Sequence, residues 1–171
     1  IREQATIGGN LVNASPAGDG APAFLTLNAE VIIKGRKDNN IYERKVNLEN
    51  FILGRNKVDL HDNEIVTALE MDNVSGYGAS FEKVGHRRSL VISTICVSCV
   101  LKTDVTGKYF EDVRIAVAGV REVPCRLTKT EKFLEGKEIN EDHILQASQL
   151  ELDVINSRSR QEYRKEVLQN F

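Results

Sequence analysis

Residues 6–22 read TIGGNLVNASPAGDGAP, in which two runs of small residues stand on either side of an apolar pair. The adjacent glycines Gly8 and Gly9 leave the backbone free to adopt positive φ and let a ligand approach its N–H groups closely. This stretch is therefore a candidate anion-binding site. A tight turn that needs glycine for its own sake is the simpler explanation of the spacing taken alone.

The composition is that of an ordinary globular protein, and it argues against several partners. The chain has 171 residues, of which 41% are hydrophobic and 28% charged, enough for one compact domain or two small ones. The net charge of −2 and the interspersed acids and bases give no long-range field that would concentrate nucleic acid or an anionic membrane. No stretch approaches 18 apolar residues, and the first residues, IREQATIGG, contain neither an apolar signal core nor an initiator Met. We expect a cytoplasmic protein without a membrane span, taken from a longer chain.

The three cysteines predict buried thiols and no metal site. Their odd number argues against a secreted disulfide framework. Cys96 and Cys99 form a C-x-x-C, but they lie in SLVISTICVSCVL, residues 89–101, whose β-branched content is typical of a strand. In a strand an offset of three places the two thiols on opposite faces, and no second Cys or His pair stands nearby in the sequence. We expect small buried thiols in a core strand.

The first 75 residues predict an antiparallel sheet with short helices. A short helix beginning near Pro22 runs into a strand from about Ala29. Further along come a turn, a return strand, a short helical turn and another strand, at residues 37–40, 41–48, 49–54 and 63–71. Glycine, serine and asparagine then replace the apolar pattern in MDNVSGYGAS, residues 71–80, and this change predicts a domain boundary.

The residues after this boundary predict a second sheet followed by three helices. A strand is expected from Leu90 to about Leu101 and, after a turn at 104–108, a second strand on which Val113, Ile115 and Val117 line one face. The helices are expected to begin at Thr128, with a capping box to Glu131 and an end at Gly136, at Asn140 and near Ser159. Their apolar residues are Ile144, Leu145 and Leu152 after Asn140, and Tyr163, Val167 and Leu168 in the third helix. Strands first and helices afterwards make an α+β fold.

Five segments in a fixed order resemble one known family. They are ATIGGNLVNASPAGDGAPAFLTLNAEV at 5–31, FEKVGHRRSLVIS at 81–93, RIAVAGVREVPCR at 114–126, EKFLEG at 131–136 and SRQEYRKEVL at 159–168. Together they resemble the flavin-binding subunit of molybdenum hydroxylases, the family of xanthine dehydrogenase and aerobic carbon monoxide dehydrogenase. The resemblance implies a second FAD-binding subdomain at 1–75 and a C-terminal domain at 76–171, in which a small antiparallel sheet packs on three helices. It also implies an N-terminal flavin subdomain with its own glycine-rich loop, which this sequence lacks.

The resemblance assigns the TIGGN run to FAD. A flavin dinucleotide carries a doubly charged pyrophosphate, which the N–H groups of Gly8, Gly9 and Asn10 could bind at little steric cost. The Thr6 hydroxyl can donate to a phosphate oxygen. The FAD-contacting residues implied in this loop are Thr6, Ile7, Gly8, Gly9 and Asn10.

Three later residues complete the implied FAD site. Asp19 matches a family carboxylate that accepts hydrogen bonds from the flavin, although a helix N-cap ahead of Pro22 also explains an acid there. Lys83 matches a family lysine near the flavin, where its ammonium would favour negative charge on the reduced ring or bind a phosphate. A solvated lysine is the commoner case. Val66 falls where the family uses backbone atoms against the ring.

The implied function is electron transfer within a larger oxidoreductase. By resemblance, the chain accepts electrons from an iron–sulfur subunit through FAD and passes them to NAD or another acceptor, while hydroxylation takes place at a molybdopterin-binding subunit. We therefore expect no catalytic residue and no metal ligand in this chain, and no activity of the chain in isolation. One alternative is a non-catalytic assembly or interaction module that binds no flavin alone. A weaker alternative is an unrelated flavin oxidase with a similar glycine turn.

Overall fold

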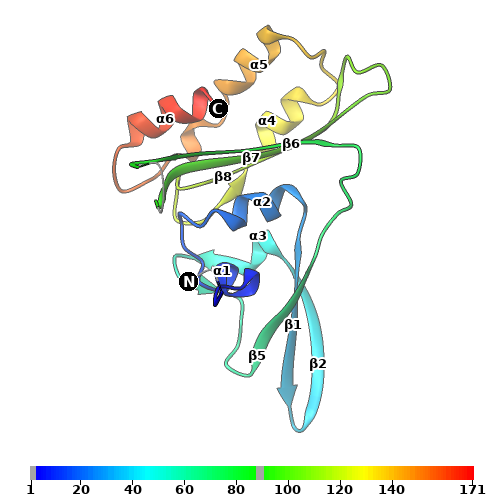
Figure 1. Ribbon diagram of the computed structural model, residues 1–171, viewed down its shortest axis with the longest axis vertical. Coiled ribbons are helices and arrows are strands. Elements are labelled where there is room, and N and C mark those ends of the chain that lie inside the picture. The colour runs from blue at the N-terminus through cyan, green and yellow to red at the C-terminus, as the bar shows by residue number, and fades with distance from the viewer. Residues whose placement is uncertain (1–2, 88–90) are drawn as a thin grey trace.

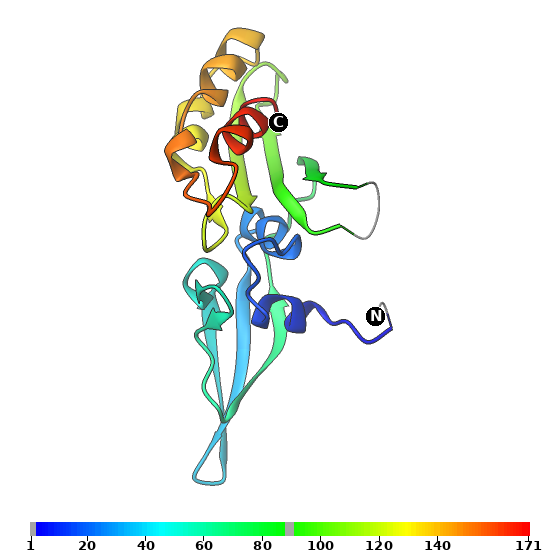
Figure 2. The same ribbon diagram turned by 90° about the vertical axis from the view of Figure 1, so that its left-hand side faces the viewer.

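The N-terminal half of the protein is a three-stranded antiparallel sheet with short helices on one face. The computed structural model describes residues 3–87 and 91–171. The long hairpin of β1 (Glu30–Lys37) and β2 (Asn40–Asn47) extends away from the rest of the molecule (Figure 2), and β5 (Glu64–Glu70) pairs with the other edge of β1. The remaining elements of this half are α1 (Ile7–Val12), α2 (Gly20–Thr26), α3 (Leu48–Phe51), β3 (Ile52–Gly54) and β4 (Lys57–Val58).

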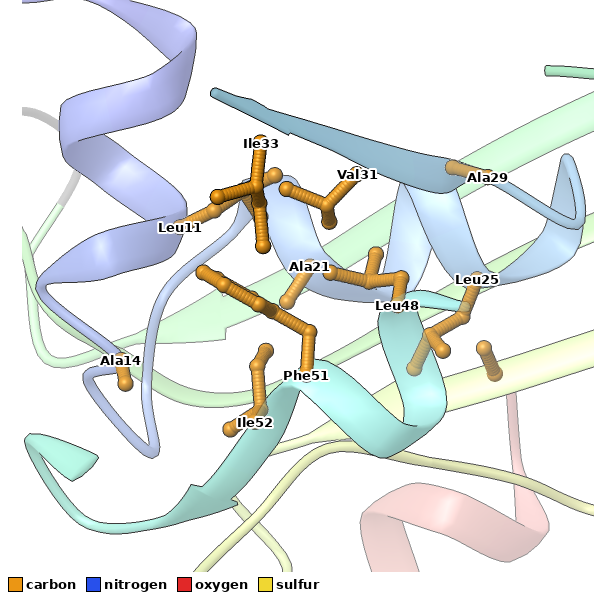
Figure 3. Close-up of a cluster of buried hydrophobic side chains, with 11 residues drawn as sticks. Leu11, Ala14, Ala21, Leu25, Ala29, Val31, Ile33, Leu48, Phe51 and Ile52 are labelled. Atoms are coloured by element: carbon orange, nitrogen blue, oxygen red, sulfur yellow. The ribbon is translucent and has the colours of Figure 1, made fainter. Parts of the chain in front are cut away.

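The first hydrophobic core lies between β1 and the three short helices. Figure 3 shows Leu48 and Phe51 of α3 pointing toward Val31 and Ile33 of β1, with Leu11 of α1 beside them. All five side chains are buried. Val31 and Ile33 face this core because side chains alternate along a strand, whereas the opposite face of the hairpin carries exposed ion pairs such as Lys34 with Glu43.

The C-terminal half is a four-stranded antiparallel sheet covered by helices on both faces. Its strands follow the order β6 (Gly78–Gly85), β7 (Ser93–Thr103), β8 (Phe110–Ala118), β9 (Cys125–Arg126). On one face lie α4 (Thr128–Leu134), α5 (Glu141–Ser148) and α6 (Gln161–Gln169), with the short 3-10 helix η1 (Leu152–Val154) between α5 and α6. Figure 1 shows α2 on the other face, so a helix of the N-terminal half packs on the sheet of the C-terminal half.

The α+β architecture is as expected, and most predicted elements are present. The helix before the first strand, the turn at its end and both later strands of the N-terminal half are found where the pattern placed them. Asp38 and Asn39, at the tip of the β1–β2 hairpin, both have positive φ, a conformation that Asn and Asp tolerate better than most residues. Val113 and Val117 of β8 are buried and Ile115 packs beside them, as predicted.

Three predictions about strands and helix ends were wrong. The predicted boundary covered residues 71–80 and no strand was predicted between it and Leu90, but Gly78–Gly85 form β6, an edge strand that is exposed over most of its length and therefore shows no apolar alternation. Strand β7 begins at Ser93 rather than Leu90, a residue outside the described part of the chain. The helical turn predicted for 49–54 ends at Phe51, and Ile52–Gly54 form a strand.

The capping box predicted for α4 does not form, because Glu131 points into the protein. The helix begins after Leu127 without a side-chain cap, so Thr128 lies inside it. The buried carboxylate of Glu131 accepts the N–H of Ile115 at 2.8 Å and pairs with Arg126. The predicted end at Gly136 is confirmed by its φ of 74°.

The predicted apolar faces of the two later helices are only partly buried. In α5 the side chains of Ile144 and Leu145 are 50% and 63% exposed, and Ala147 takes the buried position. In α6 Leu168 is buried, whereas Tyr163 is exposed. Short helices on the outside of a sheet bury only a narrow stripe, so apolar residues beyond that stripe remain exposed.

Candidate functional site

The TIGGN run is the start of a helix rather than a glycine loop. Thr6 is the N-cap of α1, and its Oγ1 accepts the N–H of Gly9 at 2.9 Å, while the N–H of Asn10 donates to the Thr6 carbonyl at 3.0 Å. Neither Gly8 nor Gly9 has positive φ. Two of the three N–H groups expected to bind a pyrophosphate are therefore used within the helix. The N–H groups of Ile7 and Gly8, at the first two positions of the helix, have no intrahelical acceptor, and the Thr6 hydroxyl keeps its proton for a ligand.

The start of α1 touches two other predicted site segments. A Cβ on Gly8 would lie 3.5 Å from Cγ1 of Val66, so the Gly8 backbone rests on the side chain that β5 presents. A Cβ on Gly20 would lie only 2.6 Å from Oδ1 of Asn10, so the Asn10 amide occupies space that any larger residue at 20 would fill. The fold thereby brings the TIGGN run beside Val66 and beside the residue that follows Asp19.

The Asp19 carboxylate does not cap its helix but joins the two halves of the protein. Asp19 is at the N-cap position of α2, yet its side chain makes no capping hydrogen bond. It accepts Lys83 Nζ on Oδ2 and Ser93 Oγ on Oδ1, across 64 and 74 residues of sequence. The side chains of Asp19 and Lys83 remain 41% and 29% exposed, so a ligand can reach the pair. The fold thus brings Asp19 and Lys83 into contact, and the Asp19 side chain does not act as a helix cap.

An open hollow begins at Lys83 and follows the end of β6. Its volume is about 550 Å³, and it is lined by Lys83, Val84, Gly85, His86, Arg87 and Val91. A Cβ on Gly85 would lie 2.5 Å from Cγ1 of Val91, so glycine is required for the close approach of these two segments. The site thus combines a positive and a negative side chain with an adjoining open surface.

Two arginines of the C-terminal sheet hold the other end of α2. Arg126 donates to the Leu25 carbonyl at 3.3 Å and to Asn28 at 2.8 Å, and it pairs with the buried Glu131. Arg114 donates to Asp72 at 2.7 Å and reaches the Thr26 carbonyl at 3.5 Å. Cations at a helix C-terminus stabilise the carbonyls that the helix leaves unpaired.

The thiols of Cys96 and Cys125 are buried, as predicted, whereas Cys99 is only partly buried. Cys96 is fully buried on the Asp19 side of β7; burial, followed by the Asp19 charge, raises the pKa of its thiol to about 12. Cys99 lies on the opposite face, where burial and then the Glu131 charge raise its pKa, and Cys125 is buried with a pKa also raised mainly by burial. Within residues 3–87 and 91–171, no group of three or more His, Cys, Asp or Glu residues could hold a metal ion.

Comparison with known proteins identifies the class and then the family. The family model described as the FAD binding domain in molybdopterin dehydrogenase matches residues 1–71, and the model of the CO dehydrogenase flavoprotein C-terminal domain matches residues 80–171. The class is therefore that of FAD-binding flavoproteins of oxidoreductase complexes. The chain belongs to the family of FAD-binding subunits of molybdenum hydroxylases, and FAD is the cofactor of this family.

Proteins from several organisms are similar to this chain in sequence. The glyceraldehyde dehydrogenase medium chain of Sulfolobus acidocaldarius is 30% identical over 173 residues, which cover 98% of this chain and 59% of that protein. The nicotinate dehydrogenase FAD-subunit of Eubacterium barkeri is 36% identical over 111 residues, covering 63% of this chain and 36% of that one. The chain therefore spans about three fifths of the first relative and less of the second.

Solved structures show the same fold. A carbon monoxide dehydrogenase from Hydrogenophaga pseudoflava superimposes with a TM-score of 0.88 at 21% identity, over 99% of this chain and 58% of that one. Quinoline 2-oxidoreductase from Pseudomonas putida 86 gives a TM-score of 0.84 at 22% identity, again over 99% and 58%. Among the helices of the described residues, none has the length and apolar character needed to cross a membrane.

Proposed function

We propose that this chain forms one side of the FAD site of a molybdenum hydroxylase and carries electrons from an iron–sulfur partner to NAD or another acceptor. The observation that carries the proposal is the Asp19–Lys83 pair, which joins the two halves of the chain beside the start of α1. Bound FAD would supply the redox chemistry, since none of the side chains at this site is itself redox-active.

The residues present fit a flavin dinucleotide. The Thr6 hydroxyl and the first-turn N–H of Gly8 are donors for a phosphate oxygen, and Ile7 is exposed beside them for an apolar contact. The ammonium of Lys83 can stabilise negative charge on a phosphate or a reduced ring, and the Asp19 carboxylate has lone pairs left to accept from ligand hydroxyl or N–H groups. Thr6, Gly8 and Lys83 would bind anionic parts of FAD, and Asp19 would fix its orientation.

The surrounding complex follows from the same family. Relatives named as a medium chain, a FAD-subunit and a subunit beta support a chain that works beside an iron–sulfur subunit and a molybdopterin-binding subunit. We infer that an N-terminal flavin subdomain supplies the other side of the FAD site and that the chain divides into domains at 1–75 and 76–171. Substrate hydroxylation would take place at the molybdenum site, so we expect the isolated chain to oxidise no substrate.

Flavin titration tests the proposal directly. FAD is added to the chain alone and to the chain mixed with an N-terminal flavin subdomain of this family, and binding is followed by quenching of flavin fluorescence. We expect weak binding by the chain alone, stronger binding in the mixture, and at least a tenfold loss of affinity for Asp19→Ala and Lys83→Ala, about the value of one charged hydrogen bond.

Lys102→Ala is the matched control, because Lys102 forms a comparable exposed ion pair with Glu111 elsewhere on the sheet. Its FAD affinity should equal that of the wild type. Equal affinity of the wild type and both site variants would contradict the proposed contacts. A failure of the wild type to bind FAD in either form would contradict the proposed function and favour the alternative of an assembly module.

A further inference from the structure

A buried serine that the sequence analysis did not single out contacts the Asp19 carboxylate. Ser93, the first residue of β7, is 5% exposed, and its Oγ donates to Oδ1 of Asp19 while Lys83 occupies Oδ2. The carboxylate is thus held at both oxygens by partners from the C-terminal sheet. Each oxygen has further lone-pair capacity, so the two contacts orient Asp19 without blocking it.

A β-bulge directs Ser93 toward Asp19. Ile95 and Val97 of β7 point to the face of the sheet that α4, α5 and α6 cover. Regular alternation would place Ser93 on that face as well. The register shifts between Val84 and Gly85 of β6, so that Val84 pairs with Ile95 but Gly85 pairs with Ser93. The additional residue in β7 reverses the alternation and turns Ser93 to the face that packs against α2.

One glycine fixes both partners of this contact. Gly119 donates its N–H to the Pro16 carbonyl at 2.8 Å, which ties the loop that precedes Asp19 to the end of β8. Gly119 has a φ of 81°, and a Cβ there would lie 2.4 Å from the carbonyl oxygen of Thr94, the neighbour of Ser93. The loop of Asp19 and the strand of Ser93 are therefore both packed on the backbone of Gly119.

We propose that Ser93 is a positioning residue for FAD, which acts by holding the Asp19 carboxylate in the orientation that the flavin requires. This inference rests on the proposed function of Asp19. Without the Ser93 hydroxyl, Oδ1 of the carboxylate loses its strong donor, and among the described residues Lys83 and the weakly donating Cys96 thiol remain to orient it. Because the ammonium of Lys83 is on a flexible stem and its side chain is 29% exposed, the carboxylate and ammonium can then turn together away from the ligand.

The test compares FAD affinities of Ser93 variants in the same titration as above. We expect Ser93→Ala to bind FAD about fivefold more weakly, a smaller loss than for Asp19→Ala because the carboxylate itself remains and loses only its orientation. Ser93→Thr, which keeps the hydroxyl, should restore most of this loss. The matched control is Ser98→Ala on the same strand, where the lost hydroxyl contacts Thr26 at 3.1 Å and Thr26 keeps its bond to the Ala23 carbonyl; its FAD affinity should be unchanged.

A second measurement needs no FAD. In a double-mutant cycle of Ser93→Ala and Asp19→Ala, followed by urea unfolding, the two midpoint shifts should be non-additive, because each variant breaks the same hydrogen bond. Additive shifts, or a Ser93→Ala affinity equal to the wild type when the wild type binds FAD, would overturn the role of Ser93 and leave the proposed function intact. Absence of FAD binding by the wild type would overturn both.

Discussion

Charged side chains of the C-terminal half hold both ends of α2. The two ends differ in how far these side chains are buried and in how much of their hydrogen-bonding capacity is satisfied within the protein. At the C-terminal end, the side chains of Arg114, Arg126 and Glu131 are only 12%, 16% and 7% exposed. Hydrogen bonds from Asn28 and Arg114 hold the pKa of Asp72 below its usual value at this end. At the N-terminal end, Asp19 and Lys83 face solvent and keep unused hydrogen-bonding capacity.

The difference separates a structural ion cluster from a ligand site. A buried, fully hydrogen-bonded charge is costly to leave unpaired, so the C-terminal end should contribute chiefly to stability. An exposed ion pair contributes little to stability because water solvates both partners, so the Asp19–Lys83 pair remains available for a ligand. Substitutions at the C-terminal end of α2 should therefore lower the stability of the protein, whereas substitutions at its N-terminal end should lower its affinity for a ligand.

The largest effect on stability is expected for Arg126→Ala. This change leaves the buried Glu131 carboxylate with the Ile115 N–H as its remaining partner among the described residues, and it removes one of the donors to the Leu25 carbonyl. The free energy of unfolding should fall by about 3 kcal/mol, as measured by urea denaturation at pH 7. A loss below about 1 kcal/mol, the value of a surface pair, would remove the distinction between the two ends of α2.

Gly119→Ala should be the next most destabilising change. The substitution places a Cβ against the Thr94 carbonyl at a residue with positive φ, so strain and collision add, for an expected loss of about 2 kcal/mol. Gly107→Ala is the control, because Gly107 has a φ of 71° but nothing within 4 Å of its added Cβ. It should cost about 1 kcal/mol. Equal midpoints for both variants in urea would show that the Gly119 contact does not fix the Asp19 loop.

Low pH should weaken a third ion cluster, which lies on the three-stranded sheet. Its Glu64 carboxylate is buried, like that of Glu131 at the C-terminal end of α2. Arg44 donates to Glu64 and Asp59 at 2.7 Å each, and its hydrogen bonds hold the pKa of Glu64 below the usual 4.5. The unfolded chain therefore binds this proton more readily than the folded chain. The stability that the cluster contributes is present above pH 4.5 and decreases as the pH falls below it, by about 1 to 2 kcal/mol.

Glu64→Gln provides the comparison for this pH effect. The variant should be less stable than the wild type at pH 7, and the difference should shrink between pH 4.5 and pH 3, as followed by urea unfolding at each pH. A constant difference across this range would contradict the assignment of the pH dependence to Glu64.

The smallest effect on stability is expected for Asp19→Asn at the open end of α2. Because the Asp19–Lys83 pair is exposed, the free energy of unfolding should change by less than about 1 kcal/mol. Circular dichroism during thermal unfolding measures this change. A loss as large as that of Arg126→Ala would identify Asp19 as a structural residue.

Local sequence patterns were sufficient for elements whose determinants are close in sequence. The hairpin of β1 and β2 was predicted because the turn residues Asp38 and Asn39 and the flanking alternation all lie within a few positions. The same reasoning failed for β6, which is an exposed edge strand, and for Glu131, whose spacing from Thr128 imitates a capping box. Its partners, Arg126 and the N–H of Ile115, are chosen by packing and cannot be read from that spacing.

By itself, the amino-acid sequence determined the α+β order of elements, the family and the burial of the Cys96 and Cys125 thiols, and it singled out Asp19 and Lys83 as candidate site residues. Only the tertiary structure decided that TIGGN begins a helix, that Asp19 bonds Lys83 and Ser93 instead of capping α2, and that two arginines close the other end of that helix. The physical reason is the distance along the sequence over which each interaction acts. Helix and turn preferences depend on neighbours within about four positions, whereas the contacts of Asp19 join residues 64 and 74 positions apart and exist only because α2 packs on the second sheet.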